Sequence, residues 1–166
     1  MRQIEEVSLK EGLSTSDLID RAGQAIANKI LDLHPVNTTI TILVGSGNNG
    51  SDGLVAARYL ANHGHQIWIY LCAPRNKIQY SSLPVDEAGI NITSIDEDTN
   101  LVNLTSILNK STVVIDSILG TGQNRPISEP IKSILLKVGE IKNRQPVLKL
   151  ISIDIPSGIN ADTGLI

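Results

Sequence analysis

The amino-acid sequence predicts an α/β fold, a three-layer αβα sandwich in which helices cover both faces of a mostly parallel sheet. Segments of strand character alternate with segments of helical character along the 166 residues, as in a series of right-handed βαβ units. The strand segments are almost continuously apolar, which is typical of parallel strands buried on both faces. A chain of this length makes one domain of ordinary size. We expect a single domain over residues 1–166 that is truncated at its C-terminal end.

The elements follow one another in the order that such units require. The predicted strands, recognised by their β-branched and apolar residues, are 38–44, 66–72, 90–95, 111–116 and 147–155. The predicted helices, recognised by apolar residues at helical spacing, lie between Asp17 and Pro35, from Leu54 to near Gly64, and over 99–110 and 128–142. Pro130 falls in the first turn of the last helix, where a missing N–H costs nothing. Residues 74–90 are polar and weakly patterned, so we expect a loop there with room for a short helix.

Composition excludes several classes of function. The formal net charge is -3 and aromatic residues make up 2% of the chain, whereas nucleic-acid binding calls for basic patches and stacking faces. The single Cys72 cannot form an internal disulfide, which fits a reducing compartment. The sequence begins without an apolar signal core, and no stretch approaches the ~20 apolar residues of a membrane span. We therefore expect a cytoplasmic protein that binds neither nucleic acid nor membrane.

A glycine-rich run follows the first predicted strand. Residues 45–50 match G-x-G-x-x-G, but the second strand ends at 71–75 without the acidic residue that a dinucleotide-binding site uses to hold the ribose. The run is therefore either a tight turn that needs glycine for its dihedral angles or a ligand-binding loop. Asn48 and Asn49 favour the loop, because a plain turn needs neither amide. Asp52 either caps the following helix or contacts the ligand.

Two aspartates end later strands and each begins a loop of small residues. Asp116 follows an apolar strand, at a partly desolvated edge that suits acid/base chemistry, although it could instead cap the following turn. Asp154 repeats the arrangement, with Ser157 in its loop. Because ligands bind outside the carboxyl ends of parallel strands, these loops and the glycine run predict one pocket. Asn124 and Arg125 could reach a phosphate there.

The polar side chains of these loops also suit a cation. Asn49, Asp116 and Ser157 form an oxygen-only set, which favours a hard cation over zinc. His63 and His65 flank Gly64 beyond a helix end and are expected at the far end of the fold. The sequence has no G-x-S-x-G run, which argues against a serine hydrolase.

At these loops the chain resembles the NAD(P)HX epimerase family, the YjeF amino-terminal domain. The resembling segments are 18–25, 45–58, 116–130 and 152–164. The resemblance implies a Rossmann-like fold, a homodimer and a bound potassium ion. It further implies that the protein interconverts the R and S epimers of hydrated NADH and NADPH. An ADP- or ATP-dependent NAD(P)H-hydrate dehydratase, in some cases fused in a longer chain, would then repair these damaged cofactors. The dinucleotide would be a substrate lying across the loops, which accounts for the missing ribose acid.

The resemblance also implies the site residues. Asn49, Asp116 and Ser157 would hold potassium, and Asp116, or as second choice Asp154, would be the catalytic acid/base. The residues expected to contact substrate are Asn48, Asn49, Gly50, Ser51, Asp52, Gly120, Thr121, Gly122, Gln123, Asn124, Arg125, Pro126 and Asp154. The family usually has glycine where this chain has Ser51. If that position has positive φ, serine adds about 1 kcal/mol of strain.

Two other functions remain open on the sequence. A non-catalytic domain of the same fold could serve as a dimerisation or RNA-associated scaffold, but the intact Asn49, Asp116, Asp154 and Ser157 argue against this. A conventional NAD-dependent oxidoreductase would need the ribose acid and a proton relay, and neither is evident in the sequence.

Overall fold

A five-stranded, all-parallel sheet forms the centre of the molecule in a computed structural model that describes residues 12, 14–34, 38–78, 89–123 and 126–165. The strands are β1 (Thr39–Val44), β2 (Gln66–Leu71), β3 (Ile90–Ser94), β4 (Val113–Ser117) and β5 (Lys149–Ser152). Their order in space is β3-β2-β1-β4-β5. The predicted α/β fold with a parallel sheet is therefore confirmed.

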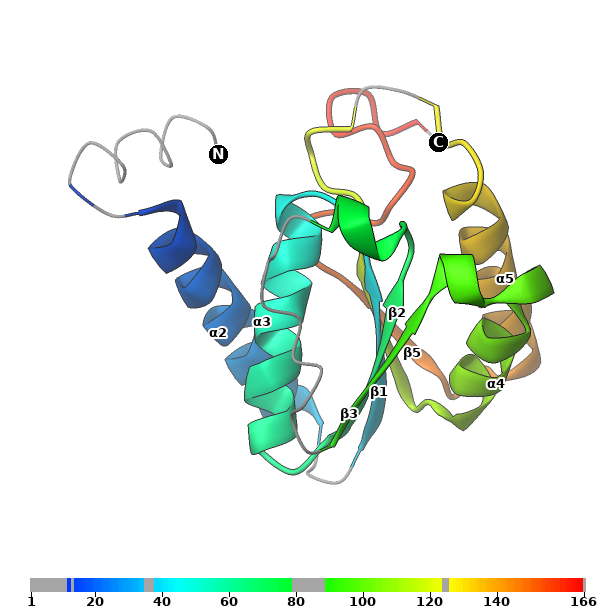
Figure 1. Ribbon diagram of the computed structural model, residues 1–166, viewed down its shortest axis with the longest axis horizontal. Helices are drawn as coiled ribbons and strands as arrows, with labels where there is room; N and C mark the ends of the chain where they lie inside the picture. Colours follow the sequence, from blue (N-terminus) through cyan, green and yellow to red (C-terminus); the bar gives the residue numbers. More distant parts are fainter. Residues whose placement is uncertain (1–11, 13, 35–37, 79–88, 124–125, 166) are drawn as a thin grey trace.

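Helices cover both faces of the sheet, so that the molecule has three layers (Figure 1). The helices are α2 (Thr15–Leu33), α3 (Asn48–Asn62), α4 (Val102–Lys110) and α5 (Ile131–Arg144), with short 3₁₀ helices η1 (Arg75–Lys77), η2 (Ile95–Glu97) and η3 (Thr99–Leu101). Helices α2 and α3 lie on one side of the sheet, and α4 and α5 lie on the other. Within the described residues, no helix combines the length and apolar character needed to span a membrane.

Alternation along each strand fills a separate core on each face. Ile40 and Ile42 of β1 pack in the cluster beneath α2 and α3. Leu43, between Ile42 and Val44 in sequence, packs in the cluster beneath α4 and α5. The side chains of Ile40, Ile42, Leu43 and Val44 are all fully buried. Burial on both faces explains why the strand sequence is apolar at nearly every position.

The largest differences from the predicted boundaries lie at helix starts. Helix α3 begins at Asn48, six positions before the predicted Leu54. Helix α4 begins at Val102 rather than at residue 99, because Asn100 and Leu101 both adopt φ of 57°. The buried Asp98 carboxylate accepts hydrogen bonds from the N–H groups of the first turn of α4 and so fixes where that helix starts.

The strand order creates a crevice at one edge of the sheet. From β1 the chain runs outward to β2 and β3, then crosses to the other side for β4 and β5. The loops after β1 and β4 therefore leave in opposite directions, and ligands bind at such a switch point in open parallel sheets.

Main-chain contacts too close for a side chain lie at this switch point. A Cβ atom on Gly50 would lie 2.0 Å from the carbonyl oxygen of Gly45, and one on Gly45 would lie 1.9 Å from the carbonyl oxygen of Ile118. The first turn of α3, the end of β1 and the loop after β4 thus pack backbone against backbone. Glycine is required here for space, and neither residue has a positive φ.

We expect Gly50→Ala to lower the free energy of unfolding by about 1–3 kcal/mol, because the new methyl group would overlap main-chain atoms that cannot move without shifting β1. Gly139→Ala is the matched control. Gly139 also lies within a helix, but a Cβ there meets nothing within 4 Å, so alanine should stabilise by about 0.5–1 kcal/mol. Urea unfolding of both variants measures the two effects, and equal changes would contradict the packing described.

Two buried histidines lie away from the crevice, near the amino ends of the strands. His34, after α2, is 8% exposed and His65, after α3, is 2% exposed. Both nitrogens of the His65 ring lack a hydrogen-bond partner among the described residues. Burial lowers the pKa of His65, and burial together with the charge of Lys149 lowers the pKa of His34.

We expect stability to fall as the pH drops below about 6.5, the usual pKa of histidine. A lowered pKa in the folded state means that the unfolded chain takes up protons first, so acid favours unfolding. The loss should begin at the unfolded-state pKa and continue down to the folded-state pKa. Thermal unfolding between pH 8 and pH 5.5 measures this. His65→Phe should flatten the pH dependence, and an unchanged slope would rule out His65 as its source.

Candidate functional site

A cleft of about 690 Å³ opens at the carboxyl ends of the central strands. Its wall is built from the loop after β1 and the start of α3, the end of β2, the loop after β4, and the residues after β5, with one side closed by α2. The lining residues are Ala22, Ile26, Gly45 to Asn49, Asp52, Cys72, Ala73, Ile118 to Gln123, Ile131, Ile153 and Asp154. Three of the loops singled out in the sequence therefore meet in one cavity, as predicted.

The start of α3 lies at this cleft. Gly47 is the N-cap and provides no side-chain hydrogen bond; it and Asn48 both line the cavity. The first turn of a helix of fifteen residues presents N–H groups and partial positive charge, which favour an anionic ligand. Of the two alternatives left open for Asp52, capping of this helix is wrong, because the helix starts four residues earlier. Asp52 lies one turn further on and lines the cleft.

Gly50 and Ser51 are buried and are not among the lining residues. Ser51 is 4% exposed, lies within α3 and donates its N–H to the carbonyl of Gly47. Its φ is not positive. The strain that a serine would add at a left-handed position therefore does not arise, and the departure from the family's usual glycine is accommodated by the helix.

The Asp116 carboxylate is engaged on all sides by donors of the protein. Oδ1 accepts from the Ser157 hydroxyl at 2.6 Å and from Ile118 N at 3.2 Å. Oδ2 accepts from Ser157 N at 2.8 Å and from the Ser152 hydroxyl at 3.5 Å. Asp116 is not among the lining residues of the cleft. This carboxylate thus ties the loop after β5 to the end of β4.

Leu119 connects the remaining members of the predicted cation set. Its N–H donates to the Ser157 hydroxyl oxygen at 2.9 Å, and its carbonyl accepts from the Asn49 amide at 3.1 Å. Asn49 and Ser157 therefore meet at Leu119, and Asp116 joins them through Ser157, so the three residues, which are far apart in sequence, come together as the sequence pattern predicted. The cluster offers carboxylate, hydroxyl, amide and carbonyl oxygens, a donor set suited to a hard cation.

Asp154 sits on the cleft wall in an uncommon backbone conformation. Its φ is 67°, and its side chain is exposed. Oδ2 accepts from Thr121 N at 2.7 Å. A Cβ atom on Gly120 would lie 2.7 Å from the same oxygen, so glycine at 120 leaves the space in which this carboxylate lies.

The other predicted substrate residues fall into three groups. Gly120, Thr121, Gly122 and Gln123 line the cleft. Pro126 lies in a second, more apolar groove of about 1020 Å³ between α5 and residues 157–165. Asn124 and Arg125, which were expected to reach a phosphate, lie outside the described residues.

Sequence reasoning missed the walls contributed by α2 and β2. Ala22 and Ile26 of α2 line the cleft, next to Gly23, whose missing side chain admits Val55 of α3. The small Ala22-Gly23 pair was the feature of the sequence that could have indicated this close approach of α2.

Cys72 lies at the end of β2, where burial and the nearby Asp116 carboxylate raise the pKa of its thiol. A raised pKa disfavours the thiolate, which is the nucleophilic form of cysteine.

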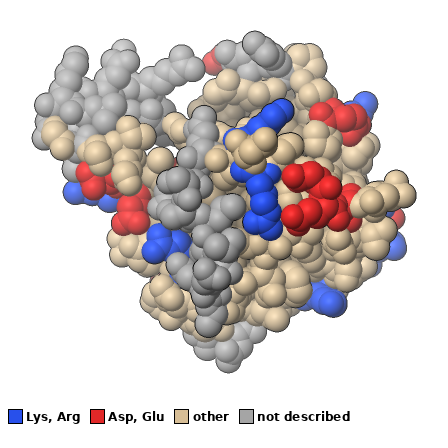
Figure 2. All heavy atoms as spheres, in the orientation of Figure 1, with Lys and Arg blue, Asp and Glu red and all other residues tan. Residues whose placement is uncertain are grey.

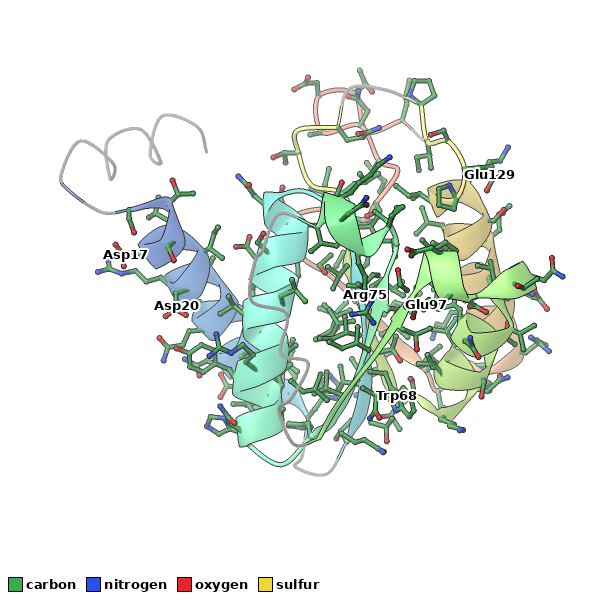
Figure 3. The ribbon with its side chains drawn as sticks, viewed as in Figure 1. Asp17, Asp20, Trp68, Arg75, Glu97 and Glu129 are labelled. Carbon is green, nitrogen blue, oxygen red and sulfur yellow. The ribbon has the colours of Figure 1, made fainter. Side chains whose placement is uncertain are left out.

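Charges outside the cleft are mixed in sign. On the face shown in Figure 2, Lys and Arg side chains lie beside Asp and Glu side chains rather than in one basic area. Arg75 and Glu97, which follow β2 and β3, point toward one another (Figure 3), with 3.6 Å between Nε and Oε1. Exposed pairs of this kind contribute little to stability. The prediction that the chain does not bind nucleic acid stays a prediction.

Three enzymes of NAD(P)H-hydrate metabolism are similar to this chain over nearly its whole length. NAD(P)H-hydrate epimerases from Lentilactobacillus buchneri and Candida albicans strain WO-1 are 34% and 33% identical to it, with 98% of this chain aligned to 72% and 68% of the relatives. A bifunctional NAD(P)H-hydrate repair enzyme from Thermofilum pendens is 34% identical over 96% of this chain, which spans only 30% of that relative's length.

The fold is shared with a solved structure. The crystal structure of the yeast protein ynu0 superposes with a TM-score of 0.74 over 93% of this chain and 66% of that one, at 24% identity. The family described as YjeF-related protein N-terminus matches residues 15–166. That match includes the glycine run, both strand-ending aspartates and every described residue of the cleft. The chain therefore belongs to the family of YjeF-related protein N-terminal domains.

Proposed function

We propose that this chain is an NAD(P)H-hydrate epimerase, an isomerase that interconverts the R and S epimers of hydrated NADH and NADPH in nicotinamide nucleotide repair. The observation that carries the proposal is the cleft at the switch point, where a helix N-terminus, small-residue loops and an aspartate line one cavity. The names of the aligned epimerases, of which the chain spans about 70%, support the same function.

The reaction requires a proton donor and acceptor in the cleft. Hydrated NADH carries a hydroxyl on the ring carbon beside the ring nitrogen. The nitrogen lone pair can expel this hydroxyl as water once its oxygen is protonated, leaving a flat iminium ring. Water then adds to the opposite face and loses a proton. A positioned carboxylate that performs both proton transfers contributes on the order of 10²–10⁴-fold.

The rest of the cleft suits a dinucleotide held as a substrate. The N-terminus of α3, with Asn48 in its first turn, favours the negatively charged pyrophosphate, and Gly120 and Gly122 allow close approach of the main chain. Cys72 and Ala73 form the wall at the end of β2, where a conventional dinucleotide site has an acidic side chain that hydrogen-bonds the ribose hydroxyls. This difference favours an epimerase over a conventional NAD-dependent oxidoreductase.

Potassium fits the cluster around Leu119. Asn49, Asp116 and Ser157 would hold the ion, since they bring only oxygen atoms and amide groups together. The ion would supply positive charge that offsets the substrate's phosphates. The homodimer, the cytoplasmic location and the partnership with a dehydratase stay predictions.

The first test is a coupled assay on the R epimer of hydrated NADH with an excess of dehydratase specific for the S epimer. We expect NADH to appear faster than in an enzyme-free epimerisation control, and faster still when potassium replaces a bulky organic cation. A rate equal to the control, from a sample shown to be folded, would contradict the epimerase proposal and favour a scaffold.

Ser157→Ala tests the cation proposal. The variant loses a cation ligand and the acceptor of Leu119 N, so we expect the potassium concentration for half-maximal activity to rise at least tenfold. Ser106→Ala, on the exposed face of α4, is the matched control and should leave the potassium dependence unchanged. If Ser157→Ala keeps the wild-type potassium dependence, Ser157 is not a ligand.

A further inference from the structure

We infer that Asp154 is the catalytic acid/base residue of this cleft and that Asp116 is a positioning residue that acts through it. This inference rests on the proposed epimerase function. It reverses the order of preference that the sequence suggested, in which Asp116, ending an apolar strand at a partly desolvated edge, came first. The hydrogen bonding and exposure of the two carboxylates differ, and that difference carries the inference.

Asp116 is poorly placed to exchange a proton with a ligand. Both of its oxygens already accept hydrogen bonds from within the protein, including the hydroxyl and the N–H of Ser157. Protonating this carboxylate would place a hydrogen against one of these donors. The residue is also only partly exposed and does not line the cleft.

Asp154 has the opposite properties. It is exposed and lines the cleft. Within the described part of the chain, its Oδ2 takes one hydrogen bond, from Thr121 N, and its Oδ1 takes none. One oxygen is therefore fixed by the protein, while the other can meet a substrate hydroxyl.

The backbone conformation of Asp154 also supports its assignment as the catalytic residue. Its φ of 67° is a conformation that costs most residues roughly 1 kcal/mol or more, and aspartate and asparagine tolerate it best. Such strain persists where the surrounding structure fixes it, often at active sites. Here Thr121 N and the space above Gly120 fix the carboxylate, so the strained residue is aimed into the cleft.

The proton transfers balance with Asp154 alone. The protonated carboxyl group gives its proton to the substrate hydroxyl, the carbon–oxygen bond breaks, water leaves, and the nitrogen lone pair forms the carbon–nitrogen double bond. The ring turns about its bond to the sugar and presents its other face. A water molecule then forms the new carbon–oxygen bond, its proton passes to the Asp154 carboxylate, and the electron pair returns to nitrogen.

Asp116 acts on Asp154 through a continuous path of contacts. It holds Ser157 by two hydrogen bonds, Ser157 accepts from Leu119 N, and the loop that contains Leu119 also contains Thr121, which donates to Asp154. Loss of the Asp116 charge should therefore loosen the loop and weaken substrate binding rather than remove the proton transfer itself.

The decisive comparison is between Asp154→Asn and Asp116→Asn in the coupled assay. Asparagine tolerates the backbone of position 154 and can still accept from Thr121 N, so this variant should fold normally. We expect its kcat to fall by on the order of 10²–10⁴-fold with KM within about threefold of wild type. Asp116→Asn should instead raise KM and lower the thermal midpoint. Asp162→Asn, an exposed aspartate in the turn after β5, is the matched control and should behave as wild type.

Asp154→Gly adds a second test, whose result would differ between a catalytic role and a purely structural role of Asp154. Glycine suits the positive φ and leaves space for a small acid, so added formate should restore part of the lost kcat of Asp154→Gly and none of that of Asp116→Asn. Retention of wild-type kcat by Asp154→Asn, or formate rescue confined to a position 116 variant, would overturn the assignment. If the wild-type protein is no faster than the uncatalysed control, the proposed epimerase function itself fails. If the wild-type protein is active and Asp154→Asn is equally active, only the assignment of Asp154 fails.

Discussion

The main-chain contact between the start of α3 and the ends of β1 and β4 is the constraint on which the other features of the site depend. A side chain on Gly50 would overlap the main chain of Gly45, and one on Gly45 would overlap the main chain of Ile118. This contact sets the height of α3 above the sheet, and therefore where its free N–H groups point. It also brings the loop after β4 against the loop after β1. A cleft at a topological switch point thus acquires a fixed floor before any polar side chain is placed.

Side-chain to main-chain hydrogen bonds then hold the loops that form the cleft wall. Asn49 reaches Leu119, Leu119 reaches Ser157, and Thr121 reaches Asp154. Each bond joins segments that are at least 33 positions apart in sequence. The Asn49–Leu119 and Leu119–Ser157 bonds are partly shielded from water, so losing one partner there costs about 1–3 kcal/mol. The loops therefore behave as one unit, and a change in one is transmitted to the others.

The sequence was sufficient for the sheet, since β1 and β4 begin and end within two residues of their predicted positions. It was insufficient where tertiary contacts override local preference. Helix α3 starts within a glycine- and asparagine-rich run of low helix propensity, because packing against Gly45 stabilises it. The predicted strand 147–155 is shortened to β5, an edge strand that pairs with β4 in the described sheet, and Asp154 beyond it has a positive φ. Both aspartates were found from the strands they follow, but which one faces the cleft depends on turn geometry that residue spacing does not encode.

Cys72 gives the molecule an internal reporter. It is the single cysteine of the chain, it is 1% exposed, and it lies at the cleft between the end of β2 and the loops. A thiol reagent can reach such a group only when the structure opens locally, so the labelling rate measures the free energy of that opening. A molecule seated in the cleft would cover the route to the sulfur. A slower labelling rate of the Cys72 sulfur would then report that a ligand occupies the cleft, without any measurement of catalysis.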